Sequence, residues 1–220
     1  MKDTRRKELL TGIVMLAAFV SWTILIRHID VKVAGPNGTV VGFARFNVSF
    51  HRLTGVHMII YTVTDWLGLI PIIICLCFGT LGFIQLVKRK RILKVDSDIL
   101  MLGVYYVLVI LCYLLFEMVP INYRPLLIDG NLEASYPSST TLLVLSVMPT
   151  LKYQIDRRIE NRIAKRAINV FADAFSAFMV IGRLISGVHW VTDIIGSILL
   201  STGLFMMYRS AVACTDKAKN

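Results

Sequence analysis

A histidine, an arginine and an aspartate lie close together in an apolar stretch near the C-terminal end of the sequence. In Gly182–Asp193, which reads GRLISGVHWVTD, His189 and Asp193 are four residues apart. On a helix, that spacing puts both side chains on one face. A carboxylate can hold one imidazole nitrogen as N–H, and the other nitrogen is then free to attack or to accept a proton. The pair therefore predicts a histidine that acts as a nucleophile or a base.

Two arginines and a helix start supply groups that bind an anion. Arg183 in the same stretch and Arg124 before a proline offer fixed positive charge for an oxyanion such as phosphate. The segment Tyr136–Thr140, YPSST, begins a helix with Ser138 as its N-cap, and exposed N–H groups at a helix N-terminus bind anions. Two arginines, a helix start and an oriented histidine together predict phosphoryl transfer through a phosphohistidine.

The composition indicates a membrane scaffold around these residues. The chain has 220 residues, of which 56% are hydrophobic, and its mean hydropathy is +0.68. Such values predict an all-α protein with several membrane-spanning helices, in one domain over residues 1–220. The net charge of +10 comes from short basic patches between apolar runs, which is typical of membrane topology and not of nucleic-acid binding. None of the four cysteines forms a CxxC pair, so we expect neither a disulfide nor a zinc site.

Apolar runs predict six transmembrane helices, because each is long enough, or nearly so, for a hydrocarbon core of ~30 Å. They cover Leu9–Ile26, Trp66–Val87, Ile99–Phe116, Pro137–Leu151, Ala167–Ile181 and, approximately, His189–Tyr208. The intervening Arg27–Asp65 is amphiphilic. In it, Pro36–Gly38 between two β-branched runs predicts a hairpin. Apolar residues at helical spacing then predict one helix lying in the interface, with Phe46, Phe50, Leu53, Val56, Ile60 and Val63 on its apolar face.

The distribution of basic residues predicts the orientation in the membrane. With the N-terminus inside, most of the 24 Lys and Arg residues fall in the inner segments. The outer segments keep only Arg27, Lys32, Arg45, Arg52, Arg124 and Arg183. The positive-inside rule therefore favours cytoplasmic termini, and it puts the candidate site residues on the outer side of what we expect to be the cytoplasmic membrane.

The segment Gly182–Asp193 resembles the third motif of the type 2 phosphatidic acid phosphatases, a family that shares its site design with the vanadium haloperoxidases. That motif is Ser-Arg-x5-His-x3-Asp, and Arg183, His189 and Asp193 match it, with Gly182 at the serine position. Motif order, motif spacing and the six predicted spans also agree with the family. The resemblance covers nearly the whole chain beyond the first loop, with a motif-bearing core at about 98–208.

The other two motifs are changed at one end. The family pattern Lys-x6-Arg-Pro keeps Arg124 and its proline, but Glu117 stands at the lysine position. The pattern Pro-Ser-Gly-His reads Pro-Ser-Ser-Thr here, so Ser139 replaces glycine and Thr140 replaces histidine.

The resemblance implies a hydrolase that removes phosphate from a lipid phosphate or diphosphate at the outer leaflet, with the bilayer as its other partner. His189 would attack phosphorus and Asp193 would orient it. The phosphate oxygens would be held by Arg124, Arg183, Ser138 and Ser139. The family requires neither a metal nor a cofactor.

The two changed motifs bear on the reaction. Thr140 cannot protonate a leaving group near neutral pH as the family's histidine does. We therefore expect either a preference for lipid diphosphates, whose leaving group departs more easily, or a substitute acid from among Glu133, Asp129 and Tyr136. Glu117 would repel bound phosphate by roughly a kcal/mol or more unless it is protonated, turned towards Arg124 or bridged by a cation.

Two other functions compete with an active phosphatase. A catalytically silent member of the family would bind a lipid phosphate or a partner protein without turnover. A small transporter is the third alternative. It is disfavoured because the ionisable residues gather at span ends on one side, and not at mid-membrane where a transport path needs them.

Overall fold

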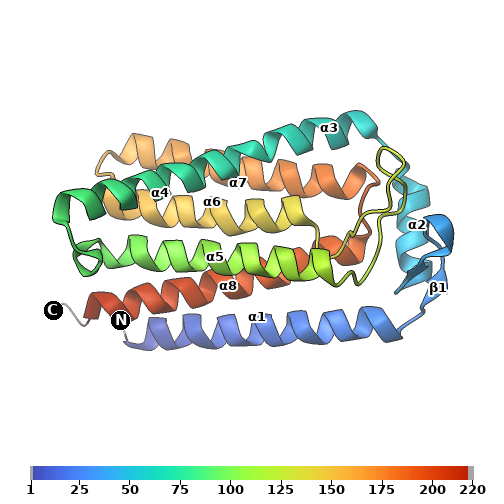
Figure 1. Ribbon diagram of the computed structural model, residues 1–220, viewed down its shortest axis with the longest axis horizontal. Coiled ribbons are helices and arrows are strands. Elements are labelled where there is room, and N and C mark those ends of the chain that lie inside the picture. The colour runs from blue at the N-terminus through green and yellow to red at the C-terminus, as the bar shows by residue number, and fades with distance from the viewer. Residues whose placement is uncertain (1, 218–220) are drawn as a thin grey trace.

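The protein is a bundle of long helices with a small hairpin at one end (Figure 1). The computed structural model describes residues 2–217. Its helices are α1 (Lys2–His28), α2 (Ala44–Thr54), α3 (Met58–Leu67), α4 (Leu69–Arg89), α5 (Ser97–Met118), α6 (Ser139–Arg158), α7 (Arg162–Ile185) and α8 (Val191–Lys217), with 3-10 turns η1 (Pro36–Gly38) and η2 (Ile92–Lys94). Strands β1 (Lys32–Val33) and β2 (Val40–Val41) pair antiparallel, as the hairpin signal predicted. The all-α membrane class is confirmed.

Five helical stretches of the described residues are long and apolar enough to cross a membrane. They are Thr4–His28, Met58–Arg89, Ser97–Met118, Arg162–Ile185 and Val191–Thr215. The fourth predicted span corresponds to α6, which falls outside this set. Its polar side chains are buried against neighbouring helices, since the Tyr106 hydroxyl bonds Thr150 at 2.8 Å and Gln154 donates to the Tyr208 hydroxyl at 2.7 Å. A helix enclosed by others can be this polar because its polar groups find partners inside the bundle.

The predicted boundary of the second span is wrong. The amphiphilic helix α2 stops at Thr54, and Gly55 follows with a φ of +73°, a conformation that glycine adopts without steric cost. A new helix then starts at Met58 and runs on through α4. Ile60 and Val63 therefore belong to a membrane helix and not to the interfacial one. Helix α3 is therefore part of the bundle, and it does not lie on the membrane surface as predicted.

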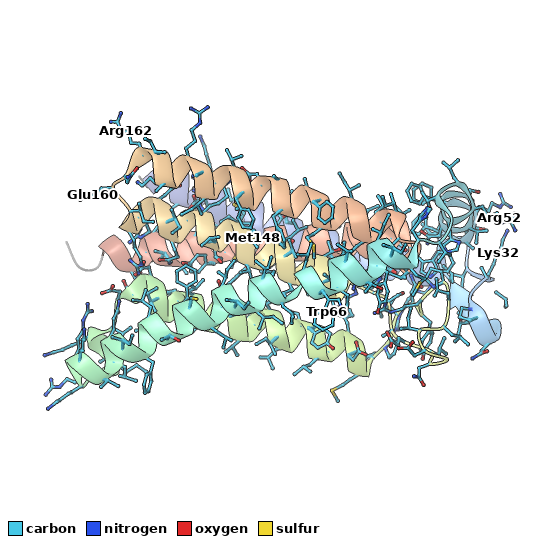
Figure 2. All side chains as sticks on the ribbon, turned by 90° about the horizontal axis from the view of Figure 1, so that it is seen from above. Lys32, Arg52, Trp66, Met148, Glu160 and Arg162 are labelled. Atoms are coloured by element: carbon cyan, nitrogen blue, oxygen red, sulfur yellow. The ribbon has the colours of Figure 1, made fainter. Side chains whose placement is uncertain are left out.

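The two ends of the bundle differ in charge and in content. Both termini lie at one end, and the hairpin, α2 and the loop between α5 and α6 lie at the other (Figure 1). Figure 2 shows Glu160 and Arg162 at the terminal end, and Lys32 and Arg52 at the opposite end. At the terminal end, buried Asp98 pairs with Arg158 at 2.8 Å. The basic segment 88–94 lies at this end too, because α4 ends there.

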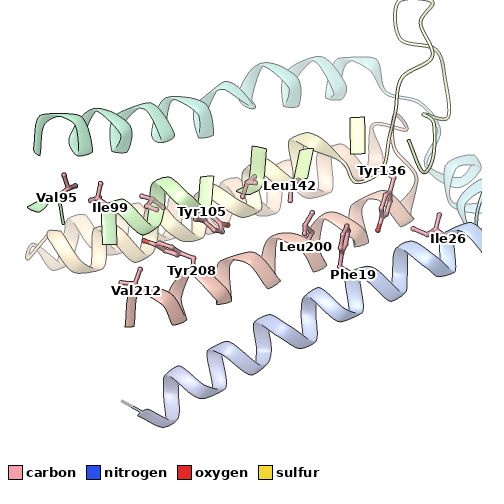
Figure 3. Close-up of a cluster of buried hydrophobic side chains, with 12 residues drawn as sticks. Phe19, Ile26, Val95, Ile99, Tyr105, Tyr136, Leu142, Leu200, Tyr208 and Val212 are labelled. Atoms are coloured by element: carbon pink, nitrogen blue, oxygen red, sulfur yellow. The ribbon is translucent and has the colours of Figure 1, made fainter. Parts of the chain in front are cut away.

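Buried side chains of α1, α5, α6 and α8 form an apolar cluster along the bundle (Figure 3). Tyr136, from the loop before α6, joins it with its ring stacked on Phe19 at a centroid distance of 6.1 Å. Gly196 makes room for that ring, since a Cβ there would lie 2.5 Å from it. Burial of a large aromatic side chain stabilises the fold by about 1.5–3 kcal/mol. The Tyr136 ring thus fixes the end of the loop that precedes α6 to the bundle.

Candidate active site

Three segments that are distant in sequence meet at the end opposite the termini. They are the loop 119–138, the start of α6 and the turn between α7 and α8. The Ser138 amide donates to the Asp193 carbonyl at 3.3 Å, and the Asn122 side chain donates to the Asp193 carboxylate at 3.3 Å. The Trp190 indole N–H donates to the Tyr123 carbonyl at 2.8 Å. These contacts bring the sequences on either side of Arg124, Ser138 and His189 together.

His189 is buried, with 3% of its surface exposed, and its two ring nitrogens have different surroundings. Nδ1 lies 3.1 Å from the Ser135 carbonyl oxygen and 3.6 Å from Asp193 Oδ2. Both neighbours only accept hydrogen bonds, so we assign the proton to Nδ1. Nε2 then carries a free electron pair, and it has no hydrogen-bond partner among the described residues.

Asp193 orients this turn more than it bonds the imidazole. Its Oδ2 accepts the backbone N–H of Trp190 at 2.9 Å, as in a capping box at the start of α8. Instead, His189 Nδ1 donates its hydrogen bond to the Ser135 carbonyl. The sequence could not reveal this partner, because a backbone oxygen has no residue signature.

Burial, together with the nearby charges of Arg124 and Arg183, lowers the pKa of His189 to about 4 against the opposing effect of Asp193. Desolvation disfavours the imidazolium, and the two nearby cations repel it. His189 is therefore neutral in the empty site at neutral pH. A neutral imidazole with a free electron pair is the form that can attack phosphorus.

The lowered pKa predicts a pH-dependent stability difference between the wild type and His189→Gln. In the unfolded chain this histidine takes up its proton near pH 6.5, whereas in the fold it resists until about pH 4. The wild type should therefore lose stability relative to the variant as the pH falls from 6.5 towards 4. We expect the difference in Tm, measured in detergent at both ends of this range, to shift by ~2 °C or more. Parallel Tm curves would contradict the buried neutral histidine.

Arg183 is almost fully enclosed, with 1% of its surface exposed, and its guanidinium is only partly used. Nη2 donates to Thr140 Oγ1 at 2.5 Å and to Asp65 Oδ1 at 3.2 Å. Nε and Nη1 are buried without a hydrogen-bond partner among the described residues. Nε carries one N–H group and Nη1 carries two, so three N–H groups of this guanidinium remain for a ligand such as an oxyanion.

Arg124 lies beside Arg183. The two guanidinium carbons are 5.8 Å and 4.9 Å from the centroid of the same ring, that of Tyr61. Arg124 Nε is 3.0 Å from Glu133 Oε2, but the N–H does not point at that oxygen, so this is an ion pair without a hydrogen bond. Its Nη1 is buried and also without a hydrogen-bond partner. Two cations held against one ring create a strong local preference for an anion.

Ser138 completes this set of unpaired groups. It occupies the N-cap position of α6, but its hydroxyl makes no capping hydrogen bond and is fully buried. Buried polar groups normally have partners, because an unmet donor costs about 1–3 kcal/mol. An oxyanion is a ligand that such unsatisfied donors can bind, and both arginines are near enough to His189 to lower its pKa. The arrangement can bind a phosphate group and attack it.

Comparison with known proteins shows the family of the chain. The model of the PAP2 superfamily matches residues 101–214, more than half of the chain. The chain belongs to the PAP2 superfamily. Its fold is similar to that in the crystal structure of a transmembrane PAP2-type phosphatidylglycerolphosphate phosphatase from Bacillus subtilis, with a TM-score of 0.66 and 16% sequence identity over 96% of this chain and 98% of that one. A comparison with curated proteins finds no match.

In this PAP2 member, the two residues that replace a family histidine and a family lysine, Thr140 and Glu117, have different surroundings. Thr140 lies inside the site, in contact with Arg183. Glu117, at the end of α5, lines a polar cavity of 230 Å³ that also contains Arg124 and Glu133. No ion pair joins Glu117 to Arg124 in the part of the chain described, and Glu133 takes that position. Ser139 begins α6 beside this cavity.

The three substitute acids predicted for this PAP2 member have unequal positions. Only Glu133 contacts a site residue, Arg124. The Tyr136 hydroxyl is 2.7 Å from Thr23 Oγ1 and so is bound to α1. Asp129 is exposed in the turn between Ile128 and Asn131, with a φ of +49°. Of the three, Glu133 therefore has the position that best suits a substitute acid beside Arg124.

Helix α3 contributes two site residues that sequence reasoning missed. Tyr61 lies under both guanidinium groups, and Asp65 contacts Arg183. The four-residue spacing puts them on one face of α3. The available signal was a single acidic residue in the otherwise uncharged stretch MIIYTVTDWL. An ionisable residue in a membrane helix is by default a functional candidate.

Proposed function

We propose that the chain is a membrane lipid phosphatase that transfers phosphate to His189 and then to water. The observation that supports this most is the buried, unpartnered Nε2 of His189 next to the unpaired N–H groups of Arg124 and Arg183. PAP2 membership and the fold of the phosphatase neighbour support phosphatase activity in general.

In the proposed reaction, the His189 Nε2 electron pair attacks phosphorus and the bond from phosphorus to the lipid oxygen breaks. The two arginines and the Ser138 hydroxyl stabilise the charge on the phosphate oxygens. The Nδ1 proton stays on the ring, donated to the Ser135 carbonyl, and the Asp193 carboxylate stabilises the cationic phosphoimidazole. Water then cleaves the bond between phosphorus and nitrogen and releases inorganic phosphate.

The lipid part of the substrate has an apolar place next to the site. A cavity of 320 Å³ between α4, α5 and α6 is lined by apolar residues that include Leu69, Ile72 and Val109. At its polar edge stand Asp65 and Thr140, which both contact Arg183. A phosphate bound to the arginines would therefore have its acyl or isoprenoid chain in this cavity.

A phosphomonoester fits better than a diphosphate in this proposal. The polar cavity on the Arg124 side carries the carboxylates of Glu117 and Glu133. A second phosphate placed there would meet two negative groups, each repelling it by about a kcal/mol or more. Glu117 thus selects for a substrate with a single phosphate and need not oppose the phosphate held by Arg183.

The proposed site faces the outer leaflet. It lies at the end of the bundle opposite the termini and opposite the basic segments that follow α4 and α6. Because basic loops stay in the cytoplasm, the site end would be exposed outside. Labelling of a cysteine introduced at Asp129 by a membrane-impermeant reagent in whole cells tests this orientation.

The activity is tested by phosphate release from purified, detergent-solubilised protein. We expect release from a short-chain phosphatidate, and slower release from an isoprenoid diphosphate. If the protein binds these lipids but releases no phosphate from either, the proposal fails and the catalytically silent alternative takes its place. That alternative is favoured by the same two residues, Thr140 and Glu117, that depart from the family motifs.

A further inference from the structure

Asp65 stands at the point where the phosphate site meets the apolar cavity. Its Oδ1 lies 3.2 Å from Arg183 Nη2, and the same nitrogen donates to Thr140 Oγ1. Thr140 also packs against the turn after Asp65, since its methyl group is 3.6 Å from where a Cβ of Gly68 would lie. The Asp65 carboxylate is therefore next to Thr140, the residue that replaces the family's histidine.

We propose that Asp65 is the general acid and base of the reaction, a role that rests on the proposed function. Arg183 turns Nη2 to Asp65 and keeps Nε and Nη1 for phosphate. Asp65 and Thr140 also line the entrance of the apolar cavity. The oxygen that joins the phosphate to a lipid chain in that cavity must pass beside them. A carboxyl group there is within reach of the leaving oxygen, as a general acid has to be.

Exposure favours Asp65 for the second step as well. Its side chain is 57% exposed, whereas that of Arg183 is 1% exposed. Asp65 therefore lies at the surface of the bundle, at an opening of the enclosed phosphate site. The water that cleaves the phosphohistidine can approach through this opening and give its proton to the carboxylate.

Gly182, which stands where the family motif has serine, helps to place Asp65 at the site. A Cβ at Gly182 would lie 2.7 Å from the Thr64 methyl group, closer than side-chain carbons approach. The serine of the family motif would push α3 away from α7. Glycine instead lets the helices approach closely, which places Asp65, the residue after Thr64, on Arg183. Glycine at position 182 thus allows α3 to supply an acid, and threonine at position 140 is the change that makes such an acid necessary.

The proton balance of the step is closed. A phosphomonoester that binds as a monoanion brings one proton, which passes to the Asp65 carboxylate as the phosphate oxygens meet the arginines. When the nitrogen–phosphorus bond forms, the phosphorus–oxygen bond breaks and its electron pair takes the Asp65 proton, which gives the lipid alcohol. Water then attacks phosphorus and gives one proton to Asp65, and the His189 nitrogen leaves with its electron pair. Inorganic phosphate carries the proton away.

The test compares two leaving groups in Asp65→Asn. Asparagine keeps an oxygen that accepts from Arg183, so the position of the guanidinium is preserved. Dodecyl phosphate needs a proton on its leaving oxygen, whereas p-nitrophenyl phosphate releases a stable anion. We measure single turnovers with enzyme in excess, which isolates the first step. The rate with dodecyl phosphate should fall about a hundredfold, and that with p-nitrophenyl phosphate less than about threefold.

The ratio of the two rates within one preparation does not depend on how much protein is folded. Asp173→Asn, the same change at a residue of α7 that pairs with Lys152 of α6, should leave the ratio unchanged. A second variant, Asp65→Asn with Thr140→His, should recover turnover of dodecyl phosphate at least tenfold, because histidine restores an acid at that place.

Equal loss with both substrates in Asp65→Asn would overturn the assignment and leave Asp65 as a positioning partner of Arg183. An unchanged rate with dodecyl phosphate would overturn it too. In both cases the wild type still releases phosphate, so the proposed function stands. If the wild type releases phosphate from neither compound nor from phosphatidate, the proposed function fails and this assignment fails with it.

Discussion

Replacing His189 by glutamine should lower phosphate release by at least about 10⁴-fold, because the variant has no atom that can form a bond to phosphorus. Glutamine is uncharged and close to histidine in size, so the buried site keeps nearly the same packing. Loss of activity would then report the missing Nε2 electron pair and not a collapsed site. The residual rate would come from the arginines and from substrate positioning.

A trapped intermediate makes this result specific. When the wild type is mixed with a lipid carrying radioactive phosphate and quenched in alkali, label should remain on the protein and be lost in acid, as expected for phosphohistidine. The His189→Gln variant should carry none. His57→Gln is the matched control, since His57 is exposed and its ring bonds only the Thr54 carbonyl, and its activity should stay within about twofold of the wild type. Label on the glutamine variant would refute His189 as the nucleophile.

The parts of the site that could be predicted are those carried by short stretches of sequence. Arg183, His189 and Asp193 lie within one stretch of 12 residues, so their types and spacing can be recognised in the sequence alone. The helices were predictable for a related reason. A membrane span must be apolar over its whole length, because lipid offers no partner to a polar group.

The parts that could not be predicted depend on contacts between distant segments. Asp65 and Arg183 are separated by 118 positions and meet only because α3 packs against α7 at Gly182. The amphiphilic pattern around α2 continues in the sequence across Gly55, and this hid α3 as the start of a membrane helix. α6 was predicted as a span like the others, yet its buried Thr150 and Gln154 show that it is enclosed by protein.

The roles of charged residues also depended on partners that sequence cannot give. Glu117 stands at the position of a phosphate-binding lysine, which suggested direct repulsion of the substrate. In the fold it lines a cavity on the Arg124 side, and Asp65 is the carboxylate that contacts Arg183. Each acidic group is therefore placed next to an arginine that has hydrogen-bonding capacity left over. The site keeps its affinity for an anion because only part of each guanidinium is used.

That division of one guanidinium predicts a large effect for Arg183→Lys. Arg183 contacts Asp65 and Thr140 through Nη2 and leaves Nε and Nη1 for phosphate. A lysine has one nitrogen, which cannot serve both groups in these directions although its charge is the same. We expect the ammonium to stay with Asp65, so that phosphate loses the N–H contacts of Arg183, which strengthen as charge develops in the transition state. kcat/KM for phosphatidate should fall about a thousandfold.

The control for the change of arginine to lysine is Arg158→Lys at the terminal end, where Arg158 Nη2 pairs with the buried Asp98 at 2.8 Å. Its kcat/KM should stay within about threefold of the wild type. Inhibition by orthovanadate, which has the shape and charge of phosphate, should weaken in Arg183→Lys and stay unchanged in Arg158→Lys. An Arg183→Lys variant within tenfold of the wild type would mean that charge alone holds the phosphate. The N–H groups on Nε and Nη1 of Arg183 would then have no role in binding, and they would have to be satisfied by something other than the substrate.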